Sequence, residues 1–220
     1  MKSFDLKKEI GLWLVMLVPM CYLAYVWSTL PEIIPTHFGF DGKPDDWSHK
    51  TMYAFLIPGL NIGIYLLMTL IPYIDPKKKL EIMGNKYFML KLFTTLFVAI
   101  ISLFIVRSSI TGVVADSSGL FCVLGGFFMF LGNYLQRAAP NYFVGFRTPW
   151  SLENEVVWKK THVLGGRLYF IAGLLTIVLS LAMKERFAPW FVGIILTASL
   201  IPAVYSYFVY RQETRKTGDN

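Results

Sequence analysis

Six long apolar windows constrain the fold of this chain more than any other feature of its sequence. A helix of about 20 apolar residues crosses the hydrocarbon core of a bilayer, so windows of this kind favour membrane spans. Charged residues make up 16% of the 220 residues, compared with roughly 25% in a soluble domain. The sequence therefore predicts an all-α fold, a polytopic membrane bundle of about six transmembrane helices. The windows are residues 10–30, 53–74, 87–106, 120–135, 163–183 and 187–209.

The distribution of basic residues supports six spans and predicts their orientation. The fourth window is the shortest, so five spans are the main alternative. With six, 16 of the 21 lysines and arginines lie on the side that holds both termini. Such an excess marks the cytoplasmic side, so we expect an N-in/C-in, multi-pass protein of the plasma membrane. The net charge of +7 is then explained by topology and by contact with anionic headgroups of the lipid bilayer, and no direct nucleic-acid partner is expected.

These spans predict two units. Residues 1–74 form an N-terminal two-helix unit, whose helices are joined by an outer loop at 31–50. Residues 87–210 form a four-helix unit that contains a cytoplasmic loop at 141–166. That loop is polar, basic and aromatic at once, and no lipid-facing helix needs such a mixture. The loop is therefore the first place to look for a function.

The outer loop is rich in proline and turn-forming residues. Pro31 and Pro35 disfavour a helix, a short strand is predicted at 36–40, and Ser48 is a suitable N-cap for the second helix. Imidazoles and carboxylates can hold a metal. Here their spacing matches no ligand pattern and the aspartates are explained by turns, so we expect no metal. The residues weighed as ligands are His37, Asp41, Asp45, Asp46 and His49.

The cytoplasmic loop begins a helix of its own. Thr148 followed by Pro149 is typical of a helix N-terminus, and a short interfacial helix is predicted from there to residue 160. Trp150 and Trp158 are natural anchors at the level of the headgroups. An ordinary amphipathic anchor is one interpretation of this segment.

The same loop offers groups suited to recognition. On a helix, Glu155, Trp158 and His162 share one face, and Arg147 can bind a phosphate or carboxylate through two N–H groups. The glycine pair at 165–166 would let the chain turn into the fifth span. Several residues add nothing to anchoring, so a preformed site for a headgroup or a protein partner is favoured. These residues are Asn141, Gly145, Arg147, Thr148 and Thr161.

Polar residues are few inside the spans. Asn61 lies one turn after Pro58, and Asn133 is spaced by seven residues from Gly126, which is itself seven from Gly119. Small residues and amides favour close helix packing with a hydrogen bond across the interface; a polar cavity for transport is the alternative. No Asp, Glu, Lys or Arg lies in the middle of a span, which argues against an ion-coupled transporter.

The sequence contains no recognised catalytic motif. Cys21 and Cys122 fall inside apolar windows and form neither a disulfide nor a metal pattern. We therefore expect no enzyme and no cofactor.

Two stretches carry a family resemblance. The first reads Asn141-x3-Gly145-x-Arg147-Thr148-Pro149-Trp150-Ser151-Leu152-x5-Trp158-x2-Thr161-His162. The second reads Pro31-x3-Pro35-x-His37, with Gly42-x2-Asp45 and Lys50. The first resembles the signature of the SdpI/YfhL-type integral membrane proteins. The second resembles the domain of unknown function that commonly precedes that signature.

This resemblance implies an immunity protein that protects a bacterium from a secreted killing peptide. It also implies signalling, in which a small winged-helix autorepressor is held at the membrane when the toxin is present. The toxin peptide would meet the outer loop and the repressor the cytoplasmic loop. The residues implied as binding sites are Pro35, His37, Asp41, Gly42, Asp45 and Lys50 outside, and Asn141, Gly145, Arg147, Thr148, Pro149, Trp150, Trp158, Thr161 and His162 inside.

Two other functions are open at this stage. A transporter or lipid-handling protein would contain a continuous polar cavity between its spans. A membrane enzyme that used His37 and the nearby aspartates would bind a divalent metal. The paired outer and cytoplasmic loops favour the immunity protein.

Overall fold

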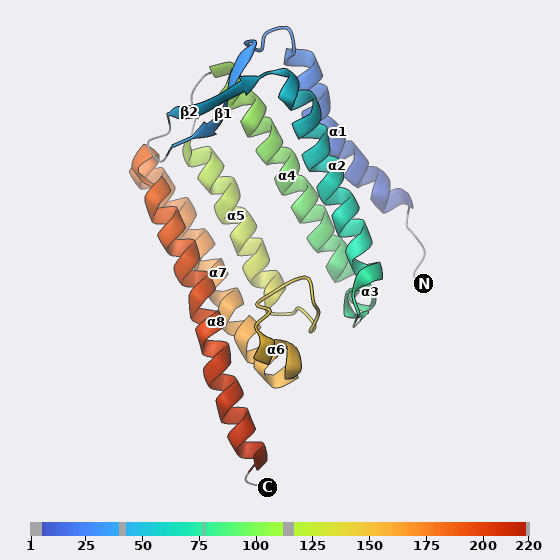
Figure 1. Cartoon of the computed structure of the whole chain (residues 1–220), viewed down its shortest axis with the longest axis vertical. Coiled ribbons are helices and arrows are strands. Elements are labelled where there is room, and N and C mark those ends of the chain that lie inside the picture. The colour runs from blue at the N-terminus through green and yellow to red at the C-terminus, as the bar shows by residue number, and fades with distance from the viewer. Residues whose placement is uncertain (1–5, 40–42, 77, 112–116, 219–220) are drawn as a thin grey trace.

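The computed structural model describes residues 6–39, 43–76, 78–111 and 117–218 of the chain. Within them, six helices are long and apolar enough to cross a membrane, so the predicted all-α bundle of six spans is confirmed. Figure 1 shows these helices side by side along the long axis of the molecule. They are α1 (Leu6–Val26), α2 (Thr51–Ile74), α4 (Asn85–Thr111), α5 (Ser117–Leu135), α7 (Glu155–Met183) and α8 (Ala188–Gly218).

The six helices pack as two groups of three (Figure 1). In one group α4 packs against α1 and α2; in the other α7 packs against α5 and α8. Helices α4 and α5 contact each other and join the groups. The predicted units 1–74 and 87–210 stay a prediction, and in the folded chain α4 lies against both helices of the first unit.

Glycines hold α5 and α7 together. Gly125 faces Gly173 and Gly132 faces Gly166, and a Cβ on Gly132 would lie 2.5 Å from the carbonyl oxygen of Gly166. Only glycine permits backbones to approach so closely, which is how helices commonly associate in membranes. The prediction that Gly126 and Asn133 lie on the packing face of α5 is therefore wrong: the residue before each of them, Gly125 and Gly132, packs against α7. Asn133 is exposed, and a Cβ on Gly126 would meet nothing within 4 Å.

A side-chain amide links α2 to α4. Asn61 is buried and donates hydrogen bonds to Ser102 Oγ at 2.8 Å and to the carbonyl of Ile57 at 2.9 Å. Its position confirms the predicted amide hydrogen bond across a helix interface. Its Nδ2 is thus paired as a packed interface requires, whereas its Oδ1 is buried and has no hydrogen-bond partner among the described residues.

A buried ion pair, which the sequence analysis did not predict, links α1 to α4. Glu9 and Lys91 are 9% and 4% exposed, and Lys91 Nζ lies 2.9 and 2.8 Å from the two carboxylate oxygens of Glu9. Tyr65 of α2 donates a third hydrogen bond to Glu9 at 2.8 Å. All three helices of the first group thus meet at one charged cluster.

The outer loop folds as an antiparallel hairpin of β1 (Ile33–Phe38) and β2 (Pro44–His49). The strand predicted at 36–40 captured only part of β1. Ser48 belongs to β2, and Lys50 occupies the N-cap position of α2, so the predicted cap is wrong. We name this end of the bundle the hairpin end. It also holds η1 (Lys184–Arg186), the tight turn that joins α7 and α8 as antiparallel neighbours.

The opposite end, which we name the loop end, carries two short helices and both termini of the described chain (Figure 1). Helix α3 (Lys79–Met83) lies between α2 and α4, and α6 (Pro149–Glu153) lies between α5 and α7. An apolar cluster fills the interior here, with Leu80 and Leu90 almost fully buried.

Candidate functional site

The segment that connects α5 to α7 is a folded structure built around Asn141. The Asn141 side chain is fully buried; its Oδ1 accepts hydrogen bonds from the N–H groups of Phe143 and Val144 at 2.8 and 2.7 Å. Its Nδ2 donates to the carbonyls of Ala139 and Val144 at 2.8 and 3.1 Å. Asparagine suits this role because its amide both donates and accepts. Asn141 therefore shapes the loop from within and does not present its side chain to a partner.

His162 fixes the loop onto α7. Its Nε2 accepts the N–H of Phe146 at 3.0 Å, and its Nδ1 lies 2.8 Å from the carbonyl oxygen of Trp158. An acceptor at Nε2 and a carbonyl at Nδ1 require the neutral ring with its proton on Nδ1. The imidazole is buried and stacks on the indole of Trp158, with ring centroids 3.8 Å apart.

Gly145 is required where the loop crosses the His162 ring. Its φ is +122°, a backbone conformation that side chains disfavour, and a Cβ there would collide with His162 Nε2. Gly165 meets the same loop from α7, since a Cβ on it would collide with the ring of Phe146. The prediction that the glycine pair at 165–166 turns the chain is therefore wrong. Both lie inside α7, where their lack of a side chain admits neighbouring atoms.

Trp158 does not act as a headgroup anchor. Its side chain is 2% exposed, and its Nε1 donates a hydrogen bond to the carbonyl of Ala138 at 2.9 Å. Thr161 is also fully buried, and its hydroxyl has no hydrogen-bond partner among the residues that the structure describes. Trp158 thus supports the loop from α7, and Thr161 lies in the interior beside it in sequence.

The predicted helix start at Thr148 is confirmed. Thr148 caps α6, its side chain accepting the N–H of Ser151, and Pro149 is the first helical residue. The helix ends at Glu153, however, so the continuous helix predicted to residue 160 is wrong. Asn154 interrupts it and caps α7 by accepting the N–H groups of the next turn at 2.8 and 3.1 Å. This second cap was missed, although asparagine before a helix is a recognisable signal.

Helix α6 is tied to α8 through Ser206. Trp150 Nε1 donates a hydrogen bond to Ser206 Oγ, and the hydroxyl of Thr148 lies 3.0 Å from the same oxygen. Ser206 is fully buried. Sequence analysis missed it, and its only signal is a hydroxyl in an otherwise apolar stretch of the last span.

Arg147 is an exposed cation of the loop. One of its guanidinium nitrogens donates to the carbonyl of Tyr142 at 2.7 Å, which orients the side chain along the loop surface. Pro149 beside it is exposed and Trp150 is half-buried. Of the nine residues predicted inside, Asn141, Trp158, Thr161 and His162 are buried. Gly145, Thr148 and Trp150 are half-buried, and Arg147 and Pro149 are exposed.

An apolar cavity of about 320 Å³ lies beneath residues 143–146. Its walls come from α2, α4, α5 and α7, and Thr94 and Tyr169 are the polar side chains among its lining residues. Such a lining does not make a continuous polar path between the spans.

At the hairpin end, the predicted residues divide into supporting and exposed ones. Pro35 is buried and its carbonyl accepts the hydroxyl of Tyr53 at 3.3 Å, which seats the hairpin on α2. His37 Nδ1 lies 2.5 Å from the carboxylate of Asp45, and both side chains are exposed. Asp41 and Gly42 lie outside the described residues. Within those residues no three His, Cys, Asp or Glu side chains gather as a metal site would require.

Lys50 holds the base of the hairpin to Glu32. Its Nζ lies 2.8 Å from the Glu32 carboxylate, and His49 approaches the other oxygen at 3.2 Å. The hydrogen bond from Lys50 lowers the pKa of the Glu32 carboxyl below its usual value of 4.5, and the charges of Lys50 and His49 act in the same direction.

The fold and these two ends define a multi-pass bacterial membrane protein with a folded loop at one end and a hairpin at the other. Residues 137–206 match the model of the SdpI/YfhL protein family, and residues 14–62 match the domain of unknown function DUF1648. The chain is similar to a protein named Immunity protein SdpI from Bacillus subtilis (strain 168), with 26% identity over 94% of this chain and 98% of that protein. No solved structure matches significantly. The resemblance to the SdpI/YfhL-type membrane proteins is thus confirmed.

Proposed function

We propose that this protein confers immunity on its cell, protecting the membrane against a secreted killing peptide. The observation that carries the proposal is the similarity to Immunity protein SdpI along nearly the whole length of both chains. SdpI/YfhL proteins are not an enzyme family, and we propose no catalytic activity.

The hairpin is our candidate for the surface that meets the peptide. It lies across one end of the bundle, over the ends of the helices (Figure 1). Ile33 and Trp47 expose 57% and 53% of their surface on it, next to the polar pair of His37 and Asp45. Exposed aromatic and aliphatic groups beside charges suit an amphipathic peptide. The predicted N-in/C-in orientation would place this surface outside the cell.

The folded loop is our candidate for an inward-facing recognition surface. Arg147 and Trp150 are its accessible charged and aromatic groups, and such residues dominate protein interfaces. A soluble winged-helix repressor is the partner that fits signalling by this family. Because the loop is held by buried hydrogen bonds, its surface is preformed and little entropy is lost on binding.

The experiment exposes cells that express the protein to a panel of secreted bacterial membrane-permeabilising peptides. Survival and membrane potential are recorded. Protection against at least one peptide is expected, and Trp47→Ala should abolish it. Trp190→Ala is the matched control, because Trp190 is similarly exposed at the hairpin end but lies on α8. If the protein is present in the membrane and protects against none of the peptides, the proposal is refuted.

The signalling part is tested separately. Arg147→Ala and Trp150→Ala should prevent soluble DNA-binding proteins from sedimenting with peptide-treated membranes. Arg137→Ala is the control, because Arg137 is also exposed but lies in the turn that follows α5. If the Arg147 variant recruits such proteins as well as the control, the loop is not the recognition surface, even if protection itself holds.

The alternative of a transporter is not favoured by the described residues. Asn61, which motivated it, is bonded within a helix interface, and the cavity near the loop is mainly apolar.

A further inference from the structure

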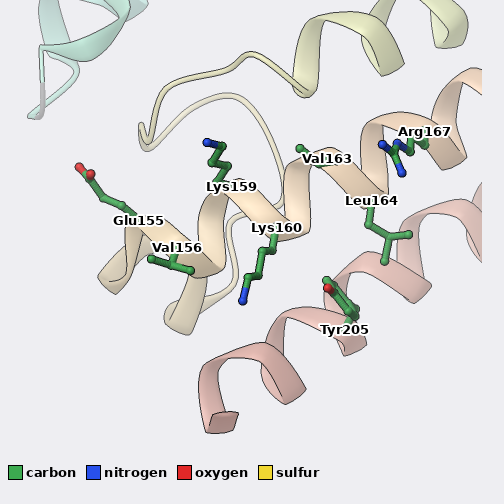
Figure 2. Close-up of a pocket in the computed structure, with 8 residues that line it drawn as sticks. All are labelled: Glu155, Val156, Lys159, Lys160, Val163, Leu164, Arg167 and Tyr205. Carbon is green, nitrogen blue, oxygen red and sulfur yellow. The ribbon is translucent and has the colours of Figure 1, made fainter. Parts of the chain in front are cut away.

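A groove outside the folded loop runs between α7 and α8 at the loop end. It has a volume of about 760 Å³, and Figure 2 shows its lining residues along the first part of α7, from Glu155 to Arg167, and on the facing side of α8. None of these residues belongs to the predicted binding sites. They are Glu155, Val156, Lys159, Lys160, Val163, Leu164, Arg167 and Tyr205.

The groove combines cations with apolar surface in a repeating pattern. Lys159, Val163 and Arg167 follow one another at intervals of four residues, so they form one stripe along α7 that spans about 12 Å. Val156, Lys160 and Leu164 form the neighbouring stripe, which Figure 2 shows on the side toward Tyr205. Each cation therefore has an apolar side chain one turn away.

Two of the three cations are available to a ligand. Lys160 is neutralised by Glu213 of α8, whose carboxylate lies 2.9 Å from its Nζ. Lys159 and Arg167 are exposed and have no ion-pair partner among the described residues. Glu155, the anionic residue of the lining, lies in the first turn of α7, one turn before Lys159 and more than three turns from Arg167 (Figure 2).

The depth of the groove places it at the boundary between headgroups and acyl chains. Helix α7 ends at Met183 at the turn of the hairpin end. Counting back the roughly 20 residues that cross the hydrocarbon puts its other boundary near Leu164. Lys159 then lies at headgroup level, and Arg167 lies about one turn inside, from where a long side chain can reach the headgroups.

We infer that this groove binds an anionic phospholipid, such as phosphatidylglycerol. Lys159 and Arg167 hold the headgroup phosphate, and one acyl chain lies along Val163, Leu164 and the ring of Tyr205. Basic pockets between transmembrane helices recognise lipid headgroups in this manner. If the loop end is cytoplasmic, as predicted, the groove opens to the inner leaflet. The bound lipid would brace α7 against α8 next to the folded loop.

The test uses the full-length protein purified in detergent and native mass spectrometry. Phosphatidylglycerol and phosphatidylcholine with identical acyl chains are added, and bound lipid is counted. Phosphatidylglycerol should bind preferentially, and the double variant Lys159→Gln/Arg167→Gln should weaken it by about fivefold for each cation removed. The double variant Lys86→Gln/Arg215→Gln removes two exposed cations from the same end but outside the groove, and it should bind as the native protein does.

Three further measurements separate lipid binding by these two charges from misfolding and from binding of phosphate alone. Lys159→Arg/Arg167→Lys keeps both charges and should keep binding, which excludes misfolding at these positions. Excess inorganic phosphate should not displace the lipid, and phosphatidylglycerol with short chains should bind more weakly. Equal binding of the two lipids, equal loss in the control double variant, or displacement by phosphate alone would each overturn the inference. None of these outcomes bears on peptide protection.

Discussion

The ion pair of Glu9 and Lys91 makes a quantitative prediction about stability. We compare Lys91→Met, Glu9→Gln and the double variant. In Lys91→Met the Glu9 carboxylate loses two hydrogen bonds, at 2.9 and 2.8 Å, and keeps the one from Tyr65 at 2.8 Å. Lys91 also lies 4.3 Å from the centre of the Tyr65 ring, so this cation–π contact disappears as well.

The magnitude follows from burial. Both side chains are almost completely buried, and removal of one partner from a buried pair typically costs about 3–5 kcal/mol. For a chain of this size, each kcal/mol lowers the melting temperature by about 2–4 °C, so 3 kcal/mol corresponds to about 6–12 °C. The double variant leaves no unpaired charge and should lose much less than the sum of the single variants.

The assay is thermal unfolding of purified protein in detergent, followed by circular dichroism. Lys86→Met is the control, because Lys86 lies on the same helix but is exposed. If Lys91→Met melts at the same temperature as Lys86→Met, the pair is not a buried contact and the packing of α1 against α4 is wrong. Additive losses in the double variant would refute the coupling between the two charges.

Three further outcomes are expected. Gly145→Ala should destabilise the loop by about 1–3 kcal/mol through its strained φ and the collision with His162. Gly126→Ala is the control, because open space surrounds Gly126. Tryptophan fluorescence during unfolding measures both variants. Gly132→Ala should push α5 away from α7 and lower the free energy of unfolding by about 1–3 kcal/mol, because its Cβ would meet the backbone of Gly166. Gly193→Ala is the control, and equal melting temperatures of the two variants would contradict the glycine contact. The fold lowers the pKa of the Glu32 carboxyl, so its ion pairs stabilise the hairpin fully above pH 4.5, and this stabilisation is lost as the pH falls through the lowered pKa. Trp47 fluorescence should change over that pH range, and Glu32→Gln should abolish the pH dependence.

The six spans were predictable because they depend on length and hydrophobicity alone. The start of α6 was also predictable, since Thr148 followed by Pro149 is a local signal. What could not be predicted is which face of each span meets protein. In a membrane the lipid is as apolar as a helix interface, so Gly125 and Gly126 look alike in the sequence, yet only Gly125 meets α7.

The candidate site shows the same limit. Trp158 was expected at the membrane surface because tryptophans often lie there, but it is buried, and its indole N–H donates a hydrogen bond to the carbonyl of Ala138. Glu9 and Lys91 lie 82 residues apart, and nothing local in either window indicates that they meet. Long-range pairs of this kind depend on how the helices are arranged, which composition does not encode.

Different side chains of the signature segment attach the folded loop to two different helices. Asn141, Trp158 and His162 build the loop on α7, whereas Trp150 attaches it to Ser206 of α8. Helices α7 and α8 are joined at the hairpin end by the turn Lys184–Arg186. The loop therefore depends on both helices of this pair: Phe146 is hydrogen-bonded to His162 of α7, and Thr148 and Trp150 contact Ser206 of α8. Arg147 lies between these two attachments, so its position at the surface is fixed from both sides.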